Sequence, residues 1–72
     1  MAPRAPRVSG SELIKQLEHL GYFQVRTSGD HVRLHHHLRR ATTVPLHEVI
    51  GPGLPRKILR DTGFTLDKLF SD

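Results

Sequence analysis

The chain has no cysteine, no tryptophan and no run of apolar residues longer than three among its 72 residues. Without cysteine there is no disulfide framework and no thiolate zinc site, so packing, a histidine-bound metal or a partner must hold the fold together. A bilayer span needs about 20 apolar residues and a signal-peptide core about 7 to 15, and we expect neither. The sequence therefore predicts a cytoplasmic protein without membrane contact.

Acidic residues are also few, with seven Asp and Glu against eleven Lys and Arg and a net charge of +4 when His is neutral. Eight of the eleven cations are Arg, whose planar guanidinium suits phosphate. Six His can add further positive charge on acidification. Nucleic acid is therefore the first partner to expect, although an acidic protein fits the same balance.

The first predicted element is a helix from Gly10 to Leu20. Ser9 and Glu12 have the spacing of a capping box, in which each side chain accepts from the other residue's backbone N–H. Apolar residues recur at helical spacing through this segment, and Gly21 stands where a left-handed C-terminal cap is favoured.

From Tyr22 the apolar period changes to two, which predicts three strands. The first strand ends at Ser28-Gly29-Asp30, a sequence with turn chemistry. The second strand turns Val32 and Leu34 toward the helix. The third spans about Ala41 to Leu46, and its proline favours a strand with one unpaired side.

A second helix is predicted over Leu54 to Thr62, and Thr65 is placed to cap a last helical turn. The order predicts an α+β two-layer sandwich with a three-stranded antiparallel sheet and helices on one face. We assign residues 9–72 to this one domain and residues 1–8, which carry two prolines and no apolar period, to a flexible arm.

The other face of the sheet should be open and should carry the chemistry. Its expected side chains are His31, Arg33 and His35 of the second strand and Gln24 and Arg26 of the first. Cutting RNA without metal needs a base, an acid and cations near the phosphate. His31 can serve in either proton-transfer role, and Arg26 and Arg33 can stabilise the negative charge that develops on the phosphate. On composition alone, however, an exposed His is more often inert.

Two other clusters invite functional interpretations. Alternate histidines in His35-His36-His37 can chelate on a strand, but a stable site wants a third or fourth ligand, so we expect no resident metal or other cofactor. A phosphate-contacting rim is predicted from five further cations, which are Arg39, Arg40, Arg56, Lys57 and Arg60. Each cation taken singly is most often a solvated surface charge.

Five segments in order resemble the HicA family of toxins across Val8 to Phe70. They are Ser-Gly-Ser-Glu-Leu-Ile-Lys (9–15), Leu-Gly-Tyr (20–22), Ser-Gly-Asp-His-Val-Arg-Leu (28–34), Thr-Thr-Val-Pro-Leu-His (42–47) and Gly-Leu-x-x-x-Ile-Leu-x-x-x-Gly (53–63). The resemblance implies a double-stranded-RNA-binding-like α-β-β-β-α fold and an mRNA interferase that blocks translation. It also implies a HicB-like antitoxin that neutralises the toxin by binding it.

The resemblance also implies a catalytic residue. In the family this is the His after Gly-Ser or Gly-Asp at the head of the second strand, which is His31 here. The frequent Gly-Ser-His form is replaced by Gly29-Asp30-His31, so Asp30 either orients the imidazole or only makes the turn. No role transfers to His35, His36 or His37.

Three hypotheses follow. The first is a metal-independent endoribonuclease toxin that uses His31 and binds RNA through Arg26, Arg33, Arg39, Arg40 and Lys57. The second is a non-catalytic RNA-binding module of the same fold. The third, favoured least, is a histidine-rich metal carrier. Incubation with RNA in excess chelator separates them, because only the first predicts cleavage.

Overall fold

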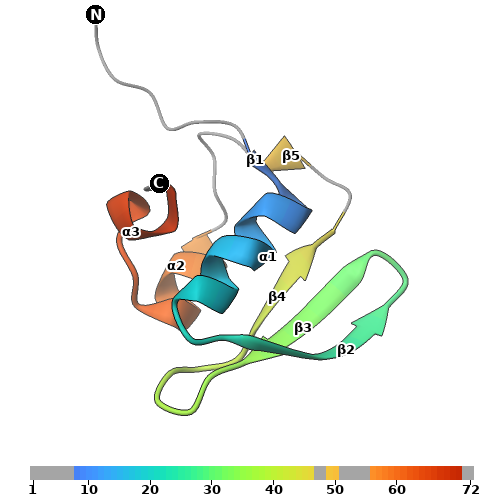
Figure 1. Cartoon of the computed structure of the whole chain (residues 1–72), viewed down its shortest axis with the longest axis horizontal. Coiled ribbons are helices and arrows are strands. Elements are labelled where there is room, and N and C mark those ends of the chain that lie inside the picture. Colours follow the sequence, from blue (N-terminus) through green and yellow to red (C-terminus); the bar gives the residue numbers. More distant parts are fainter. Residues whose placement is uncertain (1–7, 47–48, 51–55, 71–72) are drawn as a thin grey trace, which may run out of the picture.

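Helix α1 (Gly10–His19) packs on a three-stranded antiparallel sheet in the computed structural model of the chain, which describes residues 8–46, 49–50 and 56–70 (Figure 1). Strand β1 (Val8–Ser9) precedes α1 in the chain. The elements that follow α1 are β2 (Phe23–Ser28), β3 (His31–His35), β4 (Thr42–Pro45), β5 (Val49–Ile50), α2 (Arg56–Thr62) and α3 (Leu66–Phe70). This arrangement confirms the predicted α-β-β-β-α order and the α+β class. No helix in the described residues is long and apolar enough to cross a membrane.

Local signals at both ends of α1 behave as predicted. The Ser9 backbone N–H donates to Glu12 Oε1 at 3.0 Å, and the Glu12 N–H donates to Ser9 Oγ at 3.2 Å. The helix ends at His19, one residue before the predicted end, with Leu20 as its C-cap. Gly21 follows with a φ of 105°, a conformation that side chains rarely tolerate.

The sheet has the order β2-β3-β4, with both neighbouring pairs antiparallel. Gly29, with a φ of 58°, makes the tight turn between β2 and β3. Within the described residues β4 pairs only with β3, so Pro45 lies on an edge strand, where its missing N–H breaks no ladder.

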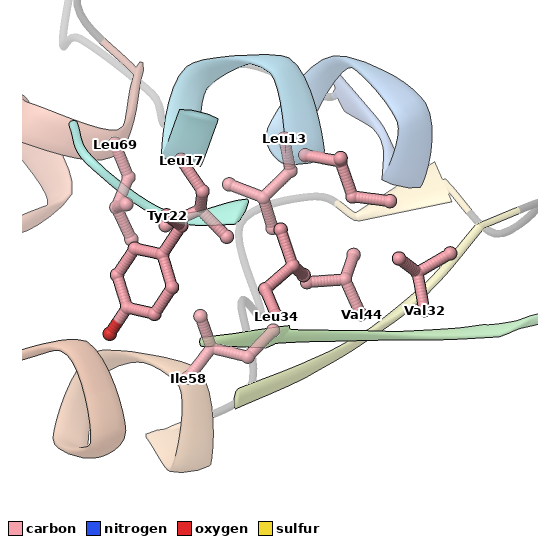
Figure 2. Close-up of a cluster of buried hydrophobic side chains, with 9 residues drawn as sticks. Leu13, Leu17, Tyr22, Val32, Leu34, Val44, Ile58 and Leu69 are labelled. Carbon is pink, nitrogen blue, oxygen red and sulfur yellow. The ribbon is translucent and has the colours of Figure 1, made fainter. Parts of the chain in front are cut away.

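The core lies between α1 and the sheet and extends to the C-terminal helices. Figure 2 shows Leu13 and Leu17 of α1 directed at Leu34 and Val44 of the sheet. The buried apolar side chains are Leu13, Ile14, Leu17, Tyr22, Val32, Leu34, Val44, Ile58 and Leu69. Burial alternates strictly along β3, which leaves the side chains of His31, Arg33 and His35 exposed on the opposite face, as the sequence predicted.

Strand β2 departs from the predicted alternation. Its register shifts between Gln24 and Arg26, so that Phe23 faces His35 and Gln24 faces the buried Leu34. Paired residues of an antiparallel ladder share a face, so the prediction that Gln24 lies on the open face is wrong. Its side-chain amide instead donates to Glu18 of α1 at 3.4 Å, and Phe23 takes a place on the open face.

Two further elements complete the fold. Antiparallel pairing of Val8 with Ile50 and of Ser9 with Val49 forms a two-stranded ribbon that the sequence did not predict. Helix α2 ends at Thr62 as predicted, while its predicted start at Leu54 lies outside the described residues. Thr65 caps α3 as predicted, since its Oγ1 accepts from the Lys68 N–H at 3.3 Å.

Candidate nucleic-acid interface

The open face of the sheet carries a shallow hollow of about 350 Å³. It is lined by Arg26, Ser28, His31, Arg33 and Thr43. All three strands contribute, because Ser28 pairs with His31 across β2 and β3, and Arg33 pairs with Thr43 across β3 and β4. The sequence did not lead us to expect Ser28 or Thr43 in this hollow. Thr43 could have been predicted, because it lies between the buried Thr42 and Val44 and therefore points to the opposite face of the sheet.

The hollow concentrates positive charge. Arg26 and Arg33 are directly opposite each other on β2 and β3, and like charges in that position repel unless an anion lies between them. The Arg33 Nη1 donates to Thr43 Oγ1 at 3.2 Å. No ion pair in the described residues neutralises either guanidinium. Guanidinium groups form strong, charge-assisted hydrogen bonds to phosphate oxygens, so two unneutralised guanidiniums beside a hydroxyl favour the binding of a phosphate.

His31 occupies one end of this hollow. It is the first residue of β3, immediately after the turn, and its side chain is exposed. The carboxylate of Asp30 has no hydrogen bond to it in the described residues, whereas the Asp30 carbonyl accepts from the Leu46 N–H at 2.6 Å. These contacts favour the turn role of Asp30 and leave the His31 imidazole without a hydrogen bond to the Asp30 carboxylate.

The other predicted RNA contacts lie outside the hollow. The Arg39 Nη1 donates to the Thr62 carbonyl at 2.7 Å, and its guanidinium lies 4.2 Å from the centroid of the Phe64 ring, so it closes the C-terminal end of α2. Lys57 pairs with Asp61 at 3.1 Å on α2. Arg40 is exposed on the β3–β4 connection. The structure thus brings only Arg26 and Arg33 beside His31.

The three consecutive histidines have different environments. His36 is half-buried: its Nδ1 accepts from the Leu38 N–H at 2.9 Å, so its Nε2 carries the proton and donates to the Leu20 carbonyl at 3.1 Å. His35 and His37 are exposed. Among the described residues no group of three His, Cys, Asp or Glu is arranged to hold a metal ion.

Comparison with known proteins identifies a family. The family model described as the HicA toxin of bacterial toxin-antitoxin matches residues 10–64, which is more than half of the chain. The matched span runs from the first residue of α1 to just beyond α2 and includes every residue that lines the hollow. No curated protein matches the chain.

Proposed function

Because this chain belongs to the HicA family and is a toxin of a bacterial toxin-antitoxin system, we propose that it is an endoribonuclease that cleaves mRNA, blocks translation and is neutralised by a HicB-like antitoxin. The observation that carries the proposal is the hollow on the open sheet face, which His31 lines together with Arg26 and Arg33. This depression thus provides one of the two proton-transfer groups that RNA cleavage requires, together with two cations that can stabilise the charge on the phosphate.

In the proposed reaction the ribose 2′-hydroxyl attacks the adjacent phosphorus. A base removes the hydroxyl proton, the new 2′-oxygen–phosphorus bond forms and the bond from phosphorus to the 5′-oxygen breaks. The leaving 5′-oxygen takes a proton from an acid, and the products are a 2′,3′-cyclic phosphate and a 5′-hydroxyl. His31 fills one of the two proton-transfer roles, since imidazole exchanges protons near neutral pH.

The two arginines that line the hollow, Arg26 and Arg33, stabilise charge on the phosphate. Their guanidiniums contact the nonbridging phosphate oxygens and stabilise the negative charge that grows on them in the transition state. Arg39, Arg40 and Lys57 lie outside the hollow, so we assign them a longer-range attraction of RNA through the net positive charge. The proposed reaction is metal-independent: His31 and a second proton-transfer group, which is not assigned to a residue, move the protons, and the arginines stabilise the charge.

The test is cleavage of a single-stranded RNA by purified parent, His31→Ala and His19→Ala proteins in excess chelator. His19 is an exposed histidine of α1 outside the hollow, so its variant is the matched control. Loss of a general acid or base should lower the rate by about 10² to 10⁴ in His31→Ala, with no change in His19→Ala. A DNA of the same sequence should remain intact, because it lacks the attacking 2′-hydroxyl.

Three results would contradict the mechanism: full activity of His31→Ala, products with 3′-hydroxyl ends, or cleavage that stops on chelation. Salt-sensitive RNA binding by the parent without any cleavage would instead support the non-catalytic RNA-binding module.

A further inference from the structure

The β2 bulge brings an aromatic ring onto the basic face. Phe23 and Arg26 are three residues apart, so in a regular strand they would point to opposite faces. The register shift between Gln24 and Arg26 removes that opposition: Phe23 pairs with the outward-facing His35, and Arg26 pairs with the outward-facing Arg33. Bulges of this kind often redirect side chains beside functional sites.

Phe23 belongs to a small exposed ring cluster, which we call the Phe23 cluster and which comprises Phe23, His35 and His37. The Phe23 centroid lies 6.3 Å from that of His35 and 5.3 Å from that of His37. Phe23 is nevertheless 41% exposed, whereas most other large apolar residues in the described part of the chain are buried or partly buried. In the described residues no hydrogen bond engages the ring nitrogens of His35 or His37. The cluster therefore offers an aromatic surface edged by free donors and acceptors.

The Phe23 cluster continues the hollow along the strand direction. His31, Arg33 and His35 alternate outward along β3, which places the His35 position about 13 Å from His31 at the normal rise of a strand, with the arginine pair between them. A chain of phosphates bound at the arginines would thus carry its next bases toward the rings. Single-stranded nucleic acid is held in this way, by cations along the backbone and aromatic rings under the bases.

We infer that the Phe23 cluster is a base-binding subsite for single-stranded RNA, in which a nucleobase next to the scissile phosphate stacks on Phe23 and its edge bonds to His35 or His37. This inference rests on the proposed function for the identity of the scissile phosphate. A base must be unstacked from its neighbours to lie on the ring, so duplex RNA is excluded from the subsite. Because every base has a π-face, the subsite selects strandedness more than sequence.

Binding is tested in the His31→Ala background, so that no ligand is cut. The ligands are oligo(U), oligo(A), an abasic ribose-phosphate oligomer of equal charge, and an oligo(A)–oligo(U) duplex. Phe23→Ala should weaken binding of the two base-bearing single strands about 5- to 100-fold. Its affinity for the abasic oligomer should not change. Val25→Ala is the matched control, since Val25 is an apolar β2 side chain of similar exposure, 45% against 41%, and it should change nothing.

A direct readout comes from Phe23→Trp, which puts a single tryptophan into a chain that has none. Stacking of a base on the indole should quench its fluorescence with both single strands, and neither the abasic oligomer nor the duplex should do so. Circular dichroism of each variant verifies the fold, which an exposed position should leave intact.

Several outcomes would overturn the subsite. The first is an equal loss of affinity for base-bearing and abasic ligands in Phe23→Ala, and the second is an equal loss of affinity in Val25→Ala. The third is RNA binding by Phe23→Trp without fluorescence quenching. The fourth is a Phe23→Ala variant that no longer binds the antitoxin but still binds RNA, which would make the cluster a protein interface. Failure of the proposed function is separate: quenching and selective binding without cleavage by the parent would refute the ribonuclease and keep the subsite. Cleavage unaffected by Phe23→Ala, with no quenching, would refute the subsite alone.

Discussion

Two buried threonines should respond in opposite ways to the same substitution. Thr42 on β4 is 0% exposed, and its Oγ1 has no hydrogen-bond partner in the described residues. Thr62 at the end of α2 is 1% exposed, but its Oγ1 donates to the Ile58 carbonyl at 2.8 Å and accepts from the Phe64 N–H at 3.3 Å. Replacement by Val removes a hydroxyl and adds a methyl group of similar size at both positions.

The expected magnitudes follow from hydrogen bonding. An unsatisfied buried hydroxyl costs about 1 to 3 kcal/mol, so Thr42→Val should raise the free energy of unfolding by about 1 kcal/mol or more. Thr62→Val should lower it by about 1 to 3 kcal/mol, because the Phe64 N–H loses its acceptor. Both residue types are β-branched, so strand and helix propensities change little.

The assay is thermal and urea unfolding of the two variants and the parent, followed by circular dichroism. A change of 1 kcal/mol moves the midpoint by about 4 to 8 °C in a domain of this size, so the opposite signs are easily resolved. Destabilisation of both variants to the same extent would refute the reasoning, since it would show that the Thr42 hydroxyl contributes favourably to the folded state.

Two further predictions concern pH and charge. Burial raises the pKa of Tyr22 above its ordinary value of 10.0, against a smaller opposing effect of Arg39; the resulting stabilisation is complete below pH 10.0 and is lost as the pH rises through the folded-state pKa. Tyr22→Phe should abolish this alkaline loss in melting profiles, and an unchanged profile would contradict the assignment. Arg33→Glu should weaken RNA and antitoxin binding together in titrations at several salt concentrations if the antitoxin covers the hollow, whereas the exposed control Arg60→Glu should affect both less. Undiminished antitoxin affinity in Arg33→Glu would place the inhibitor elsewhere.

Most local structure could be predicted from the sequence because its causes lie within a few residues. The capping box needs only Ser9 and Glu12, and the β2–β3 turn needs only a glycine that tolerates a positive φ. The outward placement of His31 and Arg33 needs only the alternation around Val32 and Leu34, whose burial drives the strand to present that face to α1.

Part of the predicted site could be derived from the same short-range alternation. His31, Arg26 and Arg33 line one hollow, as alternation suggested. Arg39 and Lys57 looked equally basic in the sequence, but one binds the end of α2 and the other pairs with Asp61. Charge along a chain does not show which guanidinium or ammonium finds a partner, because the partners come from packing.

By itself, then, the sequence of this protein determined its helices, its turns and the outward face of β3, since each depends on backbone geometry and burial over a short span. Tertiary structure alone decided the faces to which Phe23 and Gln24 of β2 belong. The bulge at Gln24 to Arg26 exists only through pairing with β3, and that pairing turns Gln24 toward α1 and Phe23 toward the basic face. The ribbon of β1 and β5 has the same origin, because each strand is only two residues long and is stabilised by a partner some forty residues away along the chain.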